Sequence, residues 1–578
     1  MSYLISDPET FTDDMIDGFV ASNPELVQRV EGGVVRAAAT PAGEVAVVIG
    51  GGSGHYPAFA GLVGRGLAHG AAMGNVFASP SAHQVYSVAK AAASDVGVLL
   101  TYGNYAGDVL NFDQAQERLI AEGIPCRTVV VTDDVSSADP DEKHRRRGVA
   151  GDFAVFRAAG WAAEQGHSLD EVWSLADRAN ERTRTLGVAF SGCTLPGAQA
   201  PLFTVAPGRM AVGMGIHGEP GIDEQDAPTA SGLARLLVDH LLVAAPQGTS
   251  AAGGRVGVLL NGLGSVKSEE LFVIYKHVAG LLGEAGLTVV APEVGEFVTS
   301  FEMAGVSLTL FWLDDTLERA WTAPAATSAY KKSQPKAVPV TIRRGTPTVG
   351  AARIPPATSP SRAAAARVVD ALRAVAAVID QNADELGRLD AIAGDGDHGI
   401  GMQRGSAAAV KAAEQALRSQ AGAGMTLRVA ADAWADRAGG TSGALWGVGL
   451  RAVAEQLGDQ HAPSADRVAC GVRDAVEAIS AAGKAKLGDK TMLDALLPFA
   501  ERLSEQVAAG VPLGIAWRAA SDRATRAAED SAVLLPQIGR ARTHHAKSLG
   551  TPDPGAVSLA LAVTATAPVL LAEKEVAP

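Results

Sequence analysis

The strongest constraint on the fold is a change of sequence pattern at residues 331–362. This segment, "KKSQPKAVPVTIRRGTPTVGAARIPPATSPSR", is rich in Pro, Thr and Ser and lacks a long apolar periodicity, which predicts a linker between domains. At residues 1–330, short β-branched runs alternate with amphipathic stretches, which predicts an α/β domain with a mostly parallel sheet. At residues 363–578, Ala-rich helical segments predict an all-α domain, an antiparallel bundle. The strands expected first are 44–50, 96–100, 127–132, 255–260 and 287–292.

Composition limits the classes of function. The chain has 578 residues, of which 47% are hydrophobic, enough for more than one core. A net charge of −14 argues against a nucleic-acid partner, because phosphate backbones are bound by clustered Lys and Arg. Cys126, Cys193 and Cys470 form no CxxC, so neither a disulfide framework nor a zinc site is indicated. No stretch approaches the roughly 18 apolar residues of a membrane span, and Leu559–Ala572 is expected to be a buried helix. A cytoplasmic protein without a membrane partner is expected.

Three segments of the α/β half carry candidate catalytic side chains. "EVAVVI" runs into "GGGSGHYP", where His55 follows a glycine-rich turn that binds a ligand or simply connects a strand to a helix. "LTYGNYAGDVLNF" places Asp108 before a helical stretch, as an N-cap or as a general base. "VGMGIHGEPG" surrounds His217 with glycines, which leaves space for a ligand, and a neutral imidazole nitrogen could add to a carbonyl carbon.

The stretch "LDAIAGDGDHGIG" in the helical half crowds Asp390, Asp395 and Asp397 together. Converging carboxylates repel one another unless a cation lies between them, and hard oxygen ligands select Mg²⁺ or Ca²⁺. A solvated acidic loop is the alternative. A Mg²⁺ held by a few carboxylates keeps positions free for nucleotide phosphates.

Two further segments predict a nucleotide site. "RAGGTSGALWG" precedes a helix, and exposed N–H groups at a helix N-terminus attract phosphate. "GRARTHHAKSLGTPDPGA" places basic side chains beside an aspartate in a Gly/Pro turn. Together with the three aspartates they predict an ATP–Mg²⁺ site on helix ends and loops. The candidate residues are Gly439, Gly440, Thr441, Ser442, Arg540, Arg542, Lys547 and Asp553.

These motifs resemble the ATP-dependent dihydroxyacetone (glycerone) kinases, which fuse a ketose-binding K domain to an all-helical nucleotide-binding L domain. The resemblance covers nearly the whole chain, from "LISDPETFTDDMIDGFVASNP" through "GGGSGH", "GNYAGDVLNF", "GMGIHGEPG" and "TSFEMAGVSLTL" to "LDAIAGDGDHG", "GGTSG", "GDKTMLDAL" and "SLGTPDPGA". It implies an eight-helix barrel for the L domain, a homodimer formed through the K domain, and transfer of the γ-phosphoryl group of ATP. No third domain resembles a phosphotransferase-system phosphodonor, which favours free ATP.

The resemblance also implies a role for individual residues. His217 would bond covalently to the substrate carbonyl as a hemiaminal, His55 would hydrogen-bond the bound ketose, and Asp108 would take the proton of the attacking hydroxyl. The three aspartates would hold two Mg²⁺ ions. Implied substrate-binding residues are Gly52, Ser53, Gly54, Gly103 and Asn104. Implied nucleotide-binding residues are His398, Gly439, Gly440, Thr441, Ser442, Gly488, Met492, Arg540, Asp553 and Gly555.

The chain departs from the family pattern at the pocket. Gly103 stands where a lysine is expected, Tyr56 and Phe59 interrupt the usual "HEPAHAG", and Asn75 replaces a glutamate. Loss of the lysine side chain is expected to leave a space for a larger substrate. We therefore expect a tetrulose such as D- or L-erythrulose, phosphorylated at a terminal carbon. Dihydroxyacetone is the alternative substrate, and a ketose-sensing regulator or a lyase that forms cyclic FMN from FAD is the alternative class.

Overall fold

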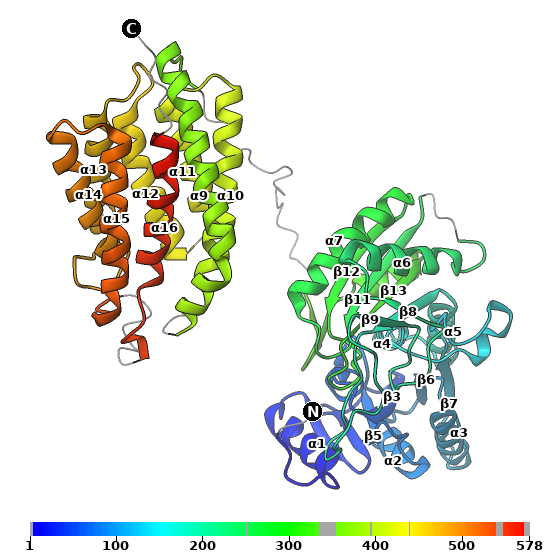
Figure 1. The fold of residues 1–578 in the computed structure, drawn as a ribbon. Coiled ribbons are helices and arrows are strands. Elements are labelled where there is room, and N and C mark those ends of the chain that lie inside the picture. Colours follow the sequence, from blue (N-terminus) through cyan, green and yellow to red (C-terminus); the bar gives the residue numbers. More distant parts are fainter. Residues whose placement is uncertain are drawn as a thin grey trace. The chain divides into compact units, whose positions relative to one another are not determined.

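The chain divides into two compact units, Met1–Thr341 and Ile342–Pro578 (Figure 1). The structure is a computed structural model that describes residues 4–249, 253–333, 354–392, 396–438, 440–538 and 547–571. Within the segment expected to be a linker, β15 (Lys331–Lys332) still pairs with β14 (Ala325–Thr327) of the first unit. At its other end, α9 of the second unit begins at Ser359. Residues 334–353 lie outside the described part.

The first sheet of the α/β unit has the strand order β1-β2-β5-β3-β6-β7. Its strands β5, β3, β6 and β7 are parallel, because helices return the chain to the same end of the sheet after β5 and β6. Both faces are covered, so that Val47 and Ile49 pack on one side and Val48 on the other. The elements are α1 (Phe11–Ser22), β1 (Val27–Val30), β2 (Gly33–Arg36), β3 (Ala46–Ser53), η1 (Ala60–Leu62), β4 (Gly64–Arg65), β5 (Gly70–Val76), α2 (Ala82–Ala92), β6 (Val98–Gly103), α3 (Ala106–Ala121) and β7 (Cys126–Val131).

The second sheet has the order β10-β9-β8-β13-β11-β12 and is mainly antiparallel. The prediction of a mostly parallel sheet is therefore wrong for this second sheet of the α/β unit. Only the pair β11 and β12, joined by a helix, is parallel among its described strands, whereas β13 follows β12 without a helix and runs back. The remaining elements of the α/β unit, of which α4 and α5 pack on the first sheet, are η2 (Pro140–Arg145), α4 (Asp152–Glu164), α5 (Leu169–Glu181), β8 (Thr183–Ala189), β9 (Arg209–Val212), β10 (Asp223–Asp226), α6 (Ala230–Val243), β11 (Arg255–Gly262), α7 (Ser268–Glu284), β12 (Thr288–Gly295), β13 (Gly305–Leu313) and α8 (Asp315–Thr322).

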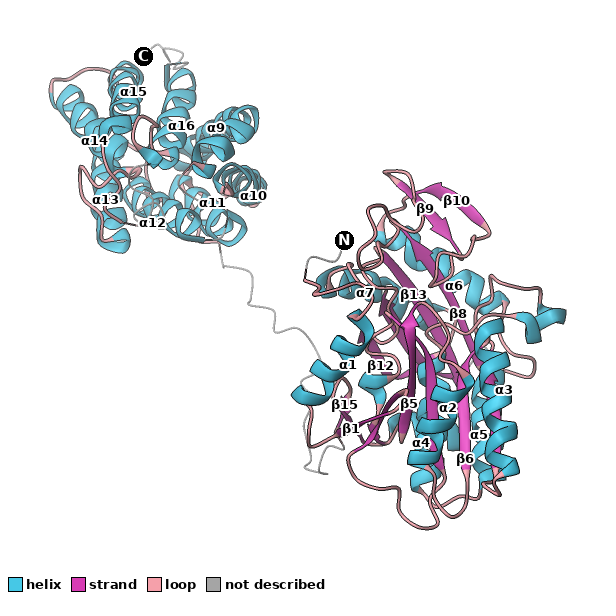
Figure 2. Cartoon of the chain, turned by 90° about the horizontal axis from the view of Figure 1, so that it is seen from below, coloured by secondary structure: helices cyan, strands magenta, loops and turns pink. Residues whose placement is uncertain are grey.

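The second unit is a closed ring of helices, seen end-on in Figure 2. Each helix packs on the next along the chain, and the last packs back on the first. The eight-helix barrel implied by the resemblance is thus confirmed. Its described α-helices are α9 (Ser359–Ala391), α10 (His398–Arg418), α11 (Ala423–Ala438), α12 (Gly440–Leu457), α13 (Ala465–Gly483), α14 (Leu493–Ala508), α15 (Leu513–Asp530) and α16 (Pro554–Leu571), and a 3₁₀ turn, η3 (Ser531–Val533), follows α15.

Helix α16 corrects one expectation from the sequence. With 18 residues and a mean hydropathy of 1.7, it is long and apolar enough to cross a membrane, although no stretch of that kind was expected. In the structure it lies between α15 and α9 and buries residues such as Leu559 and Val563 in the core of the ring. Packing thereby covers part of its apolar surface, since 39% of the helix is buried.

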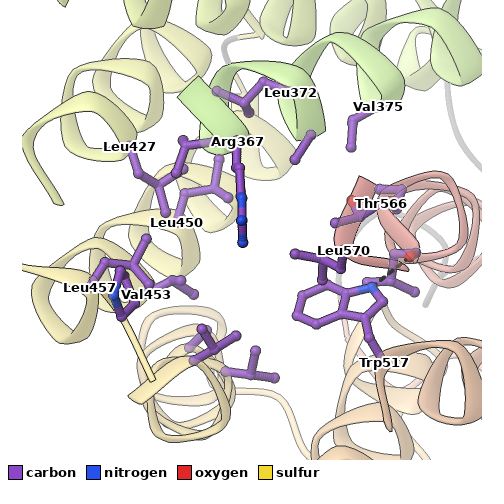
Figure 3. A pocket seen from close by; sticks show the side chains of 18 of the residues that line it. Arg367, Leu372, Val375, Leu427, Leu450, Val453, Leu457, Trp517, Thr566 and Leu570 are labelled. Atoms are coloured by element: carbon purple, nitrogen blue, oxygen red, sulfur yellow. Dashed lines mark hydrogen bonds between the residues drawn. The ribbon is translucent and has the colours of Figure 1, made fainter. Parts of the chain in front are cut away.

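The barrel encloses an apolar cavity of about 540 Å³. Figure 3 shows side chains from several helices that converge on it, among them Leu372, Leu450 and Leu570, with Arg367 extending into the open space. Many inward positions are alanines, whose side chains are too short to fill the centre of so wide a ring. Because the lining is mainly apolar, this cavity is unsuited to bind phosphate groups.

Candidate active site

The candidate ketose site lies where parallel strands β3 and β6 end. In open α/β sheets, ligands bind at the carboxyl ends of such strands. His55 follows β3 and Asp108 lies in the first turn of α3, directly after β6. His217 comes from the loop after β9 of the other sheet. The three candidate catalytic residues are therefore brought to one place by different elements.

His55 is held as a neutral acceptor. Its Nδ1 lies 2.7 Å from the Thr299 carbonyl oxygen, which can only accept, so Nδ1 carries the proton. The ring is 2% exposed and stacks on Phe77, with centroids 4.9 Å apart and planes at 8°. Burial lowers the pKa of His55 to about 3. Its Nε2 therefore presents a lone pair to Nε2 of His217, 3.0 Å away.

His217 is oriented by Glu219. The backbone N–H of His217 donates to Glu219 Oε2 at 3.0 Å, and Nδ1–H donates to Oε1 at 3.1 Å. Burial alone would raise the pKa of Glu219, but the hydrogen bond and charge of His217 outweigh it and lower this pKa to about 2. Both ring nitrogens of His217 thus face acceptors, the Glu219 carboxylate and Nε2 of His55. A proton on Nε2 of His217 would therefore be shared with Nε2 of His55.

The glycines around His217 serve packing, which corrects the expectation that they leave space for a ligand. A Cβ at Gly215 would lie 2.1 Å from Oε2 of Glu219, and one at Gly218, where φ is +84°, would lie 2.4 Å from the Phe203 ring. The absence of a side chain at Gly215 therefore allows the Glu219 carboxylate to approach His217. Glu219 also forms an ion pair with Arg147 at 3.9 Å, and Arg147 forms a second ion pair with Asp134 at 2.8 Å.

Asp108 is not a helix cap, because Tyr105 occupies the N-cap position of α3. The Asp108 side chain is buried, and its Oδ1 has no hydrogen-bond partner among the described residues. Burial raises the pKa of Asp108 to about 6, while a hydrogen bond from Ser79 and the charge of His217 oppose the shift. A carboxylate with this pKa is suited to accept a proton near neutral pH.

The remaining implied substrate-binding residues are engaged by the protein itself. Ser53 Oγ donates to the Gly74 carbonyl at 2.6 Å, and a Cβ at Gly52 would meet the Ala78 backbone nitrogen at 2.7 Å. Gly54 has φ of +101°, and its Cβ position is limited by the ring of Phe77. Asn104 Nδ2 donates to the carbonyls of His144 and Arg146 at 3.0 and 2.7 Å. These residues shape the loops around the two histidines.

Gly103 does not open the space expected from the missing lysine. A Cβ there would lie 3.1 Å from the Gly148 carbonyl oxygen and 3.2 Å from Cε2 of Tyr105. The Tyr105 ring itself packs edge-on against His217, with centroids 4.7 Å apart. Of the other departures, Phe59 lies edge-on to His55 at 6.3 Å, Tyr56 is 48% exposed, and Asn75 is exposed.

Sequence reasoning missed Phe77, Tyr105 and Glu219. Glu219 could have been found, because it stands two residues after His217 in "IHGEPG". Phe77 could not, since its φ of 55° and its stacking on His55 depend on the surrounding packing.

A second pocket, of about 500 Å³, lies in the helical unit and brings together many of the predicted nucleotide residues. His398 Nε2 lies 3.0 Å from Ser558 Oγ, and Ser442 Oγ lies 3.4 Å from His398 Nδ1. Burial raises the pKa of Asp553 to about 7. Sequence reasoning missed Lys490, which donates to the carbonyls of Leu534 and Ser548. Of the predicted residues, the lining includes Asp390, His398, Thr441, Ser442, Met492, Asp553 and Gly555.

Other predicted residues of this site lie elsewhere. Gly488 donates its N–H to Asp494 at 2.6 Å, and Gly440, with φ of +59°, begins α12; neither lines the pocket. Lys547 begins the short described segment before α16. The predicted residues outside the described part are Asp395, Gly439, Arg540 and Arg542.

The aspartate group bears on a metal site. Asp390 lies near the end of α9, with Oδ2 3.4 Å from the backbone nitrogen of His398, and Asp397 is the N-cap residue of α10. No group of three metal-ligating side chains occurs within the described ranges, which omit Asp395. Carboxylate oxygens are ligands that suit Mg²⁺. The helix N-termini at the neighbouring pocket suit phosphate groups.

Together, the fold and the two sites define a two-domain ketose kinase. Residues 17–329 match the Dak1 domain and residues 392–567 match the DAK2 domain, so the chain belongs to the dihydroxyacetone kinase family. The family resemblance of the sequence motifs is thereby confirmed.

Similar proteins include two tetrulose kinases. The chain is 59% identical to an L-erythrulose kinase of Pectobacterium atrosepticum, over 99% of this chain and 97% of the relative. It is 54% identical to a D-erythrulose kinase of Mycolicibacterium smegmatis, over 97% of both chains. The structure resembles the dihydroxyacetone kinase from C. freundii in complex with AMP-PNP and Mg²⁺, with a TM-score of 0.59, 30% identity, and coverage of 98% of this chain and 99% of that one.

Proposed function

We propose that this enzyme transfers the γ-phosphoryl group of ATP to a terminal hydroxyl of a tetrulose, D- or L-erythrulose. The observation that carries the proposal is the pair of facing nitrogens, Nε2 of His55 and Nε2 of His217, beside a buried carboxylate in Asp108. The similarity to two erythrulose kinases supports a tetrulose over a triose. A homodimer, as the family resemblance implies, and a cytoplasmic location, as the sequence features predict, are part of the proposal.

The histidine pair can form a hemiaminal with the ketose. As Nε2 of His217 bonds to the carbonyl carbon, its proton passes to Nε2 of His55 and from there to the carbonyl oxygen, which becomes a hydroxyl. One C–N bond forms and the C=O π bond breaks. The adduct keeps the positive charge of the imidazolium, and the carboxylate of Glu219 compensates that charge before and after the step. A polyol has no carbonyl carbon and is excluded.

Asp108 then serves as the general base. Its carboxylate accepts the proton of the terminal hydroxyl, whose oxygen attacks the γ-phosphorus while the bond to ADP breaks. Asp390, Asp395 and Asp397 would hold Mg²⁺, as two ions if the family pattern applies. The ion would neutralise charge on the phosphate oxygens. His398, Thr441 and Ser442 would bind the nucleotide in the pocket of the helical unit.

The test is an ADP-release assay with Mg-ATP that compares D-erythrulose, L-erythrulose, dihydroxyacetone and glycerol. A higher kcat/KM for one erythrulose than for dihydroxyacetone is expected, with no turnover of glycerol. Mass spectrometry of the enzyme trapped with ketose should locate the adduct on His217, and His217→Ala should lose both adduct and turnover. A kcat/KM for dihydroxyacetone equal to or above that for both erythruloses would identify an ordinary dihydroxyacetone kinase.

A further inference from the structure

Asp152 carries a buried carboxyl group, one oxygen of which makes no hydrogen bond to the described residues. It is the first residue of α4 and is 4% exposed. Its Oδ1 has no hydrogen-bond partner in the part of the chain that the structure describes. A buried polar group without a partner is destabilising, so its retention requires an explanation.

Helix capping does not explain Asp152. The amides in front of α4 are bound by another aspartate, because Asp133 accepts from the N–H groups of Val149 and Gly151 at 2.8 and 2.7 Å. Asp152 therefore lies beside an N-terminus that is already satisfied. Its Oδ1 is thus a buried acceptor that no described residue uses.

Asp152 reaches the candidate ketose site through a close contact of two glycines. A Cβ at Gly148 would lie 2.4 Å from Cα of Gly103 and 2.9 Å from Oδ1 of Asp152. The carboxyl group thus lies beside the end of β6, at the position where the family pattern expects a lysine. Any side chain at position 103 would press on Gly148 and on the ring of Tyr105.

Two more polar atoms around His217 also lack partners among the described residues. They are Oδ1 of Asp108 and the hydroxyl of Tyr105, both buried. Burial raises the pKa of Asp152, with smaller contributions from the charges of Asp133 and Asp108. Asp108 and Asp152 are therefore close enough for the charge of one to affect the other. One of them, Asp108, suffices for the attacked hydroxyl, which leaves hydrogen-bonding capacity for a further hydroxyl.

We propose that Asp152 is a specificity-determining residue that hydrogen-bonds the hydroxyl group that a tetrulose carries and a triose lacks. This inference rests on the proposed function. Burial raises the pKa of the Asp152 carboxyl group and so favours its protonated form, which can both donate to and accept from a hydroxyl. The contact between Asp152 and the substrate then requires that position 103 carries no side chain. The glycine has this role instead of opening the space that was expected from the sequence.

The test measures kcat/KM of Asp152→Ala and Asp152→Asn for the preferred erythrulose and for dihydroxyacetone. Asp152→Ala is expected to lower the value for erythrulose by about tenfold or more, and the value for dihydroxyacetone by less than about threefold. Asp152→Asn keeps a donor and an acceptor and should recover part of the loss. Asp141→Ala, an exposed aspartate of η2, is the control. Equal losses for both ketoses would overturn the proposal, because they would indicate a structural role.

Calorimetric binding of each ketose without ATP separates this inference from the proposed function. If the wild type transfers no phosphate to any ketose, the proposed function fails, yet a selective loss of erythrulose binding in Asp152→Ala would still support the inference. Unchanged binding of both ketoses would overturn it. Thermal unfolding verifies folding, and both variants should be at least as stable as the wild type at pH 8. The raised pKa of Asp152 means that the folded protein loses stability as pH rises toward that value, a penalty that Asn and Ala lack.

Discussion

Replacement of Glu219 by Gln tests whether the charge on His217 is essential. Both Glu219 oxygens accept from His217, one from the backbone N–H at 3.0 Å and one from Nδ1–H at 3.1 Å. A glutamine amide has the same shape but only one acceptor. If its NH₂ group faces the ring, the proton of His217 must remain on Nε2, and the nucleophilic lone pair is lost. If the NH₂ group instead faces the backbone N–H of His217, two hydrogen-bond donors face each other and neither finds an acceptor.

The magnitude follows from the kind of hydrogen bond that is lost. Hydrogen bonds to charged groups contribute about 1.5–3 kcal/mol. At about 1.4 kcal/mol for each factor of ten, kcat/KM for the ketose should fall about 10- to 150-fold. Because the adduct is a cation, the fraction of enzyme that carries ketose on His217 should fall in parallel.

The assay is ADP release over pH 5–9, combined with mass spectrometry of the ketose adduct. Glu224→Gln, in the exposed strand β10, is the matched control and should leave both readouts unchanged. The Glu219 pKa of about 2 lies far below this range, so the wild-type carboxylate stays charged at every pH of the assay. A Glu219→Gln enzyme with wild-type kcat/KM and a normal adduct would refute the role assigned to Glu219.

Three further predictions follow from the two sites and the barrel. Asp108→Asn should lower kcat about 10²- to 10⁴-fold while calorimetric ketose binding persists; in the wild type, kcat/KM should fall as pH drops below about 6, because protonated Asp108 cannot accept a proton. An acid limb that survives in Asp108→Asn would contradict this assignment. His398→Ala should raise KM for ATP without changing ketose binding, since His398 lines only the pocket of the helical unit; an unchanged KM would remove His398 from the nucleotide site. Trp434→Ala should lower the free energy of unfolding of the helical unit by about 3–5 kcal/mol, because the Trp434 ring is 1% exposed and stacks on Trp446 with centroids 4.8 Å apart. Urea unfolding followed by circular dichroism measures this loss. A loss below about 1 kcal/mol would contradict the packing argument.

Several features of this enzyme could be predicted from local sequence. The change of pattern at residues 331–362 separates an α/β half from a helical half, and the strands expected at 44–50 and 96–100 occur as β3 and β6. Local sequence suffices there because the period of apolar residues reflects the repeat of each element. Unusual local combinations, such as His217 among glycines, also identified candidate residues without knowledge of the residues they contact in the structure.

Only the tertiary structure decided which groups meet. His55 and His217 are 162 residues apart, and their 3.0 Å contact exists because loops from two different sheets converge. The same packing places the Tyr105 ring and Gly148 where an open space was expected beside Gly103, and it buries Oδ1 of Asp152 without a hydrogen-bond partner among the described residues. Strand direction in the second sheet was likewise mispredicted, because it depends on how the chain crosses between strands. The physical reason is common to all of these: residue patterns encode local conformation and burial, whereas distances between remote side chains are set by the packing of whole elements.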